Sequence, residues 1–229
     1  MKHKIFCFLW YKIIIKLIPV GKDKNGFIRN HKRINAQLYL AGIFGTIKCI
    51  LLGDSEHGQF DKYDVMKEFD DLTVNLSISG TTPLDLYNYF MTTGKDIYQK
   101  VKLHSATKFI STGGNCSLRN LMIEVPESMI NVHNMLPESI IILIPPVYTG
   151  ILAKLYNMVK IDKPESQIVS EINIVRNFQR SIWSPCVLDT YTPFVDPQTG
   201  LPLLGVLKDP VHFGRQVVDL IQKVYKSIT

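Results

Sequence analysis

The chain has 229 residues, of which 46% are hydrophobic and 20% are charged. This length suits one generous domain, and this composition is the average globular mix, so disordered, collagen-like and disulfide-dense chains are excluded. The four cysteines lie far apart without a C-x-x-C pair, which excludes a zinc ribbon and a thioredoxin-like motif. No run of about 20 apolar residues, the length that a membrane-spanning helix needs, is present.

The positive charge is concentrated at the amino terminus. The formal net charge is +6, yet residues 1–35 hold nine Lys or Arg and one acid, so residues 36–229 are nearly neutral. Residues 5–20 are apolar except for Lys12 and Lys16, and at helical spacing the apolar and basic residues separate onto opposite faces. We therefore predict that residues 1–35 form a basic amphipathic segment that attaches residues 36–229, the globular domain, to an anionic membrane surface.

Two other interpretations of this segment stay open. A cleaved signal peptide also combines a basic start with an apolar run, although no A-x-A-like cleavage site follows here. The segment could also pack on the domain as an ordinary helix. A nucleic-acid partner is not expected, because Phe27 is the only aromatic residue among the later basic residues and no recognition motif is present. The expected location is the cytoplasm or the inner face of a bacterial-type membrane, with export as the alternative.

From about residue 46 the chain alternates short apolar runs with helical stretches. The predicted strands are residues 47–52, 72–78, 108–111, 139–144 and 187–190. The predicted helices are residues 83–91, 117–123, 150–159, about 165–182 and about 213–227. Short strands that are buried on both faces and alternate with helices predict an α/β protein with a parallel sheet covered by helices on each side. The long irregular segment 192–211 is of a kind that is often functional.

The residues that follow the strands carry the chemistry, because ligands of an open parallel sheet bind beyond the carboxyl ends of its strands. These residues are Gly53-Asp54-Ser55 after the first strand, Gly80 after the second, Gly113-Gly114-Asn115 after the third and Asp209 to His212 before the last helix. The set contains a hydroxyl nucleophile, a histidine base, a carboxylate three residues before that base, and amide donors. A serine attacks an ester when a base takes its proton, a carboxylate orients the base and donors stabilise the oxyanion. The set therefore indicates acyl transfer.

In this order the four blocks resemble those of the SGNH hydrolases, also called GDSL lipases and esterases, over about residues 46–215. The resemblance implies a flavodoxin-like, three-layer α/β/α sandwich with a parallel sheet. It also implies that Ser55 is the nucleophile and that His212 is the general base, oriented by Asp209. The implied oxyanion hole consists of the backbone N–H groups of Ser55 and Gly80 with the side-chain amide of Asn115. No cofactor and no metal is implied.

Two residues depart from the family pattern. Glu56 stands where Leu is usual, and Cys116 stands where Asp is common, but neither change removes a catalytic group. Cys116 is expected to be a buried small residue and not a redox centre. The G-x-S-x-G elbow of the α/β-hydrolases is absent, which argues against that fold.

Each block residue also has a structural interpretation. Ser55 or Asn115 could cap a helix, Gly80 could serve only as a turn residue with a positive φ, and His212 could lie on the surface. A metal site is not expected, because the following three residues do not have a recognised ligand spacing. They are Asp54, His57 and Asp61.

The predicted activity is that of a serine esterase that removes an acyl group, acetyl or another short chain, from an oxygen of a carbohydrate or lipid-linked glycan. The ester class follows from the resemblance, and the glycan from the basic amphipathic start, which is similar to that of bacterial envelope-glycan assembly proteins. The alternative is an O-acyltransferase with the same residues, in which a sugar hydroxyl replaces water. A third hypothesis is a binding module that keeps the fold without catalysis, and the presence of Ser55, Asp209 and His212 argues against it.

Overall fold

The computed structural model describes residues 35, 38–39, 47–54, 72–78, 80–145, 163–199, 202–203, 206 and 214–228. The predicted amphipathic segment, apart from Asn35, and the predicted helix 150–159 therefore lie outside the described residues. The same holds for Ser55, Asp209 and His212.

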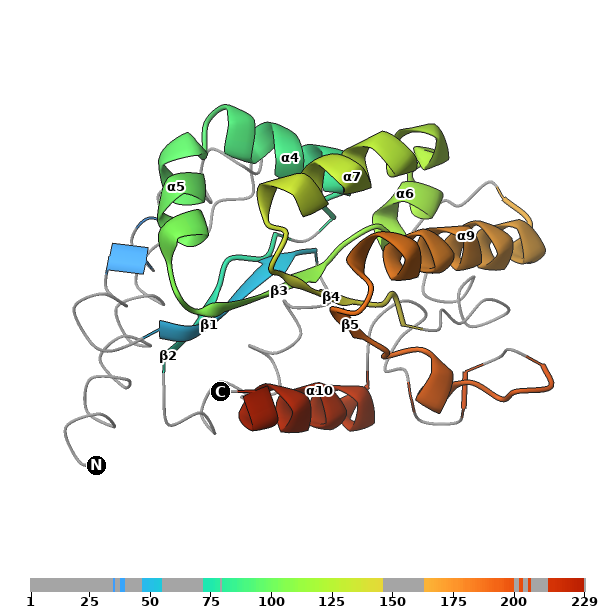
Figure 1. The fold of residues 1–229 in the computed structure, drawn as a ribbon. Helices are drawn as coiled ribbons and strands as arrows, with labels where there is room; N and C mark the ends of the chain where they lie inside the picture. Colours follow the sequence, from blue (N-terminus) through green and yellow to red (C-terminus); the bar gives the residue numbers. More distant parts are fainter. Residues whose placement is uncertain are drawn as a thin grey trace.

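Five parallel strands form the centre of the molecule, in the order β2-β1-β3-β4-β5 (Figure 1). Their bounds are β1 Ile47–Gly53, β2 Leu72–Asn75, β3 Thr107–Ser111, β4 Ile140–Ile142 and β5 Val187–Leu188. The predicted parallel sheet is confirmed, although the last two strands are shorter than predicted. Beyond the regular part of β2, the N–H groups of Leu76 and Ile78 still donate to carbonyl oxygens of β1, so the chain follows the sheet close to the predicted end.

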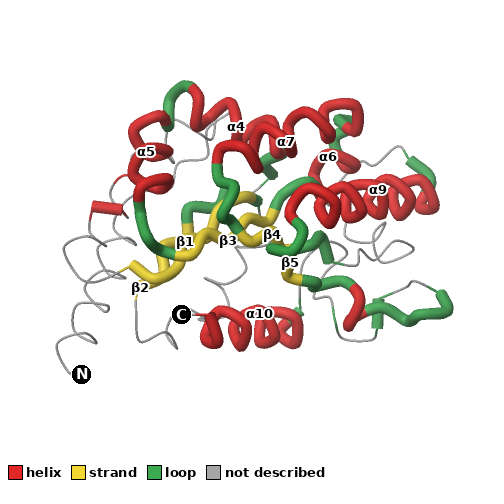
Figure 2. Tube along the Cα trace, in the orientation of Figure 1, coloured by secondary structure: helices red, strands yellow, loops and turns green. Residues whose placement is uncertain are grey.

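Helices cover both faces of the sheet, which gives three layers (Figures 1 and 2). The helices on one face are α4 Pro83–Met91, α5 Lys95–Leu103, α6 Gly114–Leu118, α7 Val125–Met135 and α9 Glu165–Trp183, and the described helix on the other face is α10 Arg215–Ile228. Successive side chains of a strand point to opposite faces. Ile50 and Ile110 accordingly lie in the core under the first group of helices, whereas Leu51 and Phe109 lie in the core with residues of α10. The predicted three-layer α/β/α architecture is confirmed.

Three of the predicted helices, α4, α9 and α10, are confirmed within two residues at each end. The predicted helix 117–123 is instead the short α6 followed by a 3-10 turn, Met122–Glu124. Helices α5 and α7 were not predicted. Only Ile97 and Val101 of α5 are buried, so its apolar stripe is narrow. A second 3-10 turn, Thr192–Phe194, lies in the segment predicted as irregular.

The backbones of β1 and β3 come closest at Gly53, the last residue of β1. Gly53 has a φ of +113°, and a Cβ built on it would lie 1.8 Å from the carbonyl oxygen of Ser111, so only glycine fits here. The N–H of Asp54 donates to that same carbonyl oxygen at 2.8 Å. The carbonyl oxygen of Gly53 accepts from the N–H of Ile78 at 2.8 Å and from the hydroxyl of Thr81 at 3.0 Å. The segments that follow β1, β2 and β3 are thus bonded to one another at this point.

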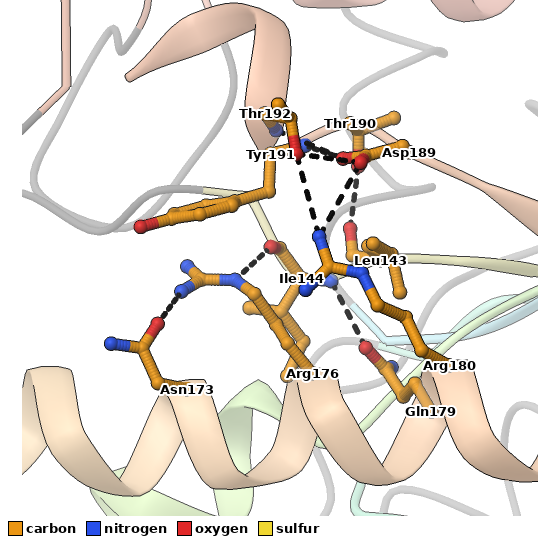
Figure 3. A network of polar contacts seen from close by, with 10 residues as sticks. All are labelled: Leu143, Ile144, Asn173, Arg176, Gln179, Arg180, Asp189, Thr190, Tyr191 and Thr192. Carbon is orange, nitrogen blue, oxygen red and sulfur yellow. Dashed lines mark hydrogen bonds and ion pairs between the residues drawn. The ribbon is translucent and has the colours of Figure 1, made fainter. Parts of the chain in front are cut away.

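A glutamine of α9 joins the carboxyl ends of β3 and β4. The side chain of Gln179 is fully buried, and its Nε2 donates to the carbonyl oxygen of Thr112 at 2.8 Å. Its Oε1 accepts from the N–H of Ile144 at 3.3 Å (Figure 3). The hydroxyl of Thr190 donates to the carbonyl oxygen of Leu143, which ties the end of β5 to the end of β4. The strand ends are therefore fixed by buried side chains as well as by the sheet.

Replacing Gly53 by alanine is expected to lower the free energy of unfolding by more than about 3 kcal/mol, because the new Cβ would overlap the carbonyl of Ser111. Gly80→Ala is the matched control. Gly80 also has a positive φ, +82°, but nothing lies within 4 Å of a Cβ built on it, so the expected loss is about 1–2 kcal/mol. Urea unfolding of both variants measures the difference, and equal losses would contradict the close approach at Gly53.

Gln179→Leu is expected to destabilise the protein by about 2–4 kcal/mol, because the buried carbonyl of Thr112 and N–H of Ile144 lose their side-chain partner. The control is Gln167→Leu, which removes an exposed hydrogen bond to Glu171 on the same helix and should change stability by less than about 0.5 kcal/mol. Thermal unfolding followed by circular dichroism tests the pair. A Gln179→Leu variant as stable as its control would show that the two backbone groups do not depend on this side chain.

Candidate functional site

The segments that follow β1, β2 and β3 meet at one edge of the sheet. Of the predicted site residues, the structure describes Gly80 and Asn115, and it brings them together: Nδ2 of Asn115 donates to the carbonyl oxygen of Thr81, the residue after Gly80, at 2.9 Å. Asp54 reaches the same edge through its bond to Ser111. The predicted oxyanion donors Gly80 and Asn115 therefore lie beside the end of the strand that leads into Ser55.

Asn115 does not cap the helix that carries it. It is the second residue of α6, the N-cap is Gly113, and no side chain bonds to the free N–H groups at the start of that helix. The amide of Asn115 reaches back to Thr81 instead. A primary amide has two N–H donors. The bond to Thr81 occupies one of them, and no acceptor among the described residues takes the other.

Gly80 has the positive φ that its position in the turn requires, and it is exposed. The volume next to its Cα is open, because a built Cβ meets no heavy atom within 4 Å. The turn interpretation of Gly80 is therefore correct as far as its backbone is concerned. It is compatible with the donor role, since a ligand can approach the backbone on this side.

Asp54, which directly precedes Ser55, is held twice by Ser111. Its N–H donates to the backbone carbonyl of Ser111, and its carboxylate Oδ1 accepts from the hydroxyl of Ser111 at 3.1 Å. The side chain of Asp54 is 4% exposed. The sequence predicts Ser111 only as a strand residue, although a serine beside Phe109 and Ile110 at the end of a buried strand is a signal of a polar role there.

Cys116 is a buried residue, as predicted. It is 1% exposed, and burial raises the pKa of its thiol to about 12. The group is therefore a neutral thiol at physiological pH and lacks the thiolate that redox or nucleophilic chemistry needs.

The segment that contains Asp209 and His212 begins and ends at two residues that bond to each other. The N–H of Gly214 donates to the carbonyl oxygen of Val206 at 2.6 Å. Val206 is buried against α10 in the core that includes Val217. Residues 207–213 themselves lie outside the described part of the chain. Their two ends are thus fixed on the same side of the sheet as α10.

The turn that follows β5 is held by the carboxylate of Asp189 (Figure 3). The carboxylate of Asp189 accepts from the N–H groups of Tyr191 and Thr192, both at 2.9 Å, and from the hydroxyl of Thr192 at 2.6 Å. It also pairs with Arg180 of α9 at 3.3 Å. Burial alone would raise the pKa of Asp189, but these hydrogen bonds outweigh burial and hold the pKa below its ordinary value. Asp189 is therefore ionised at neutral pH and stabilises the turn.

Arg176 of α9 fixes the end of β4 beside that turn. Its Nε donates to the carbonyl oxygen of Ile144 at 2.6 Å, Nη2 donates to that of Pro145, and Nη1 donates to Asn173 Oδ1 at 2.6 Å. The ring of Tyr191 lies on the guanidinium, and its centroid is 3.8 Å from Cζ of Arg176 (Figure 3). Arg176 is 2% exposed, and burial lowers its pKa to about 10, so it stays charged at neutral pH. It is a buried cation that no carboxylate of the described residues pairs with.

Within the ranges that the structure describes, no group of three or more His, Cys, Asp or Glu side chains is arranged to hold a metal ion. None of the helices in those ranges is long and apolar enough to span a membrane.

No family model matches the sequence, and no curated protein sequence matches it. Solved structures do match. A GDSL-like lipase from Bacteroides thetaiotaomicron VPI-5482 is similar with a TM-score of 0.60 and 16% identity, over 87% of this chain and 96% of that one. A lipase/acylhydrolase from Enterococcus faecalis is similar with a TM-score of 0.56 and 17% identity, over 79% of this chain and 95% of that one. A member of the lipolytic protein G-D-S-L family from Veillonella parvula DSM 2008 is similar with a TM-score of 0.53 and 14% identity, over 80% of this chain and 98% of that one.

These matches cover nearly the whole length of each of the three lipolytic proteins. TM-scores of 0.53 to 0.60 over this length show that the fold is shared. The four sequence blocks predicted the same architecture. The chain has the three-layer α/β/α fold of the SGNH hydrolases.

Proposed function

We propose that the protein is a serine esterase that removes an acetyl or other short acyl group from an oxygen of a carbohydrate or lipid-linked glycan. In this proposal Ser55 is the nucleophile, His212 is the general base and Asp209 orients His212. The backbone N–H groups of Ser55 and Gly80 and the amide of Asn115 form the oxyanion hole. The reaction needs no cofactor and no metal.

The observation that carries the proposal is the convergence of Gly80 and Asn115 beside the end of β1. An amide donor and an open, exposed glycine at the carboxyl edge of a parallel sheet suit the stabilisation of an oxyanion. The proteins with the same fold that are named above are described as lipases and acylhydrolases, which supports an ester as the substrate.

The proposed reaction has two steps. In the first, Ser55 Oγ attacks the ester carbonyl carbon while His212 takes the hydroxyl proton, and the carbonyl oxygen becomes an oxyanion bound by the three donors. The intermediate then expels the sugar oxygen, which receives the proton from His212, and Ser55 is left acylated. In the second step, water attacks the acyl carbon while His212 takes its proton, the bond between that carbon and Ser55 Oγ breaks, Oγ receives the proton from His212, and the carboxylic acid leaves. Loss of one oxyanion donor is expected to lower the rate by a factor of about 10²–10³.

A fluorophosphonate probe tests the nucleophile. Intact mass analysis should show one adduct on the wild type, no adduct on Ser55→Ala and much slower labelling of His212→Ala, because the probe reacts with an activated serine. Ser181→Ala, which removes an exposed hydroxyl of α9, is the control and should label like the wild type. A folded wild-type protein that is not labelled would contradict the proposal and favour the binding module.

Product analysis then identifies the acceptor. With an acylated sugar alone, an esterase releases the free acid. If an added acceptor sugar instead receives the acyl group at the expense of the acid, the protein is an O-acyltransferase that uses the same residues.

The glycan part of the proposal depends on membrane attachment through residues 1–35. The full chain should sediment with vesicles that contain anionic lipid and not with zwitterionic vesicles, because the basic residues interact with anionic headgroups. Charge reversal at Lys12 and Lys16, to Glu, should weaken this binding without changing the rate of Ser55 labelling. Binding that is equal for both vesicle types, or unaffected by the charge reversal, would contradict electrostatic attachment.

A further inference from the structure

Arg119, the residue after α6, lies beside the proposed oxyanion hole. Its Nη1 donates to the carbonyl oxygen of Gly80 at 3.3 Å and pairs with Asp85 Oδ2 at 2.6 Å. None of the four sequence blocks includes Arg119 or Asp85. Arg119 is the described side chain that bonds directly to the backbone of Gly80.

Arg119 and Asn115 act on neighbouring peptide groups. The two residues are four positions apart, so at helical spacing they lie on the same side of this turn of the chain. They bind consecutive carbonyl oxygens, Gly80 by Arg119 and Thr81 by Asn115. Both peptide groups that follow the Gly80 Cα are therefore held by side chains from one short stretch.

Asp85 fixes the guanidinium that makes this contact. Its carboxylate accepts from the N–H of Thr82 at 2.9 Å, and its own N–H donates to the hydroxyl of Thr82 at 3.1 Å, so the pair forms the capping box at the start of α4. The same carboxylate oxygen, Oδ2, pairs with Arg119. Asp85 thus fixes the guanidinium of Arg119 relative to the start of α4.

Gly80 needs such a restraint because glycine, which has no Cβ, has wide freedom about both backbone dihedral angles. A small rotation at Gly80 would turn its N–H away from a bound carbonyl, whereas an oxyanion donor works only when its direction is set in advance. The carbonyl of Gly80 belongs to the peptide group on the other side of the Cα from its N–H, so a hydrogen bond to this carbonyl limits rotation about ψ of Gly80.

We propose that Arg119, oriented by Asp85, is a positioning residue: it holds the peptide group that follows the Gly80 Cα and thereby the backbone conformation at Gly80, so that the Gly80 N–H faces the reacting carbonyl group. This inference rests on the proposed function. Arg119 itself does not touch the substrate in this role. Its removal should therefore lower kcat and leave KM nearly unchanged, because the interaction that it supports forms only in the transition state.

Hydrolysis of 4-nitrophenyl acetate by the full chain tests the role. Arg119→Gln should lower kcat about tenfold, because a misdirected donor causes only part of the rate loss that a missing donor causes. Arg119→Lys keeps a cation that can donate to the carbonyl of Gly80 and should recover most of the loss. Because Arg119 is 47% exposed, both variants should keep the wild-type Tm. Lys100→Gln, which removes one exposed cation and one hydrogen bond on α5, is the control and should keep wild-type kcat.

A double variant separates positioning from an unrelated effect. Arg119 and Asn115 both bind the turn of Gly80 and Thr81. The double variant Arg119→Gln, Asn115→Ala should therefore lower kcat by less than the product of the two single effects. Independent, multiplicative effects would overturn the proposal. An Arg119→Gln variant with unchanged kcat, or with only a raised KM, would also overturn it. The same holds if Arg119→Gln has a lower Tm and Arg119→Lys does not restore kcat.

The failure of this inference can be told apart from the failure of the proposed function. If the fluorophosphonate labels Ser55 of the wild type and of Arg119→Gln at the same rate, the positioning role is wrong and the esterase proposal stands. If the folded wild type is not labelled and does not hydrolyse the ester, the proposed function itself is wrong.

Discussion

At the carboxyl ends of β1 and β3 the two backbones lie so close that the side chain at residue 53 can be no larger than a hydrogen atom. This approach lets the N–H of Asp54 reach the carbonyl of Ser111, and it presents the carbonyl of Gly53 to the hydroxyl of Thr81. The residue before Ser55 and the turn of Gly80 are therefore positioned by the same contact. A wider separation of the two strands would displace both at once, because they share these backbone groups.

Buried polar side chains of α9 give the rest of this edge its rigidity. Gln179 joins β3 to β4, and Arg176 binds the carbonyl groups that end β4 while it packs against Tyr191. Buried polar groups are costly unless each finds a partner, so such contacts admit few alternative arrangements of the backbone. Catalysis that depends on donors set in advance of the reaction benefits from this kind of support, since little reorganisation is then needed in the transition state.

The sequence was sufficient to predict the parallel sheet and the three layers. Apolar runs and the glycines that end them carry this information locally. Helix α7 was missed because its buried residues, such as Met129 and Val132, alternate with Ser and Asn, although Pro126 in its first turn is a usual start signal. Ser111, Gln179 and Arg119 could not be assigned roles, because their partners lie 57, 67 and 34 residues away. Several of these partners are backbone carbonyls, which leave no trace in the sequence.

Among the described helices, those on the two faces of the sheet come from different parts of the chain. Helices α4 to α9 are interleaved with the strands, whereas α10, the described helix on the opposite face, is the last element in the chain. During synthesis the apolar side chains of Leu51 and Phe109 are made long before Val218 and Ile221, which pack against them. A ribosome-bound chain that has completed the five strands has therefore not yet made the α10 side chains that pack against Leu51 and Phe109. The docking of α10 completes this part of the core, and the same step brings Gly214 to Val206 and joins the two ends of the segment that carries His212.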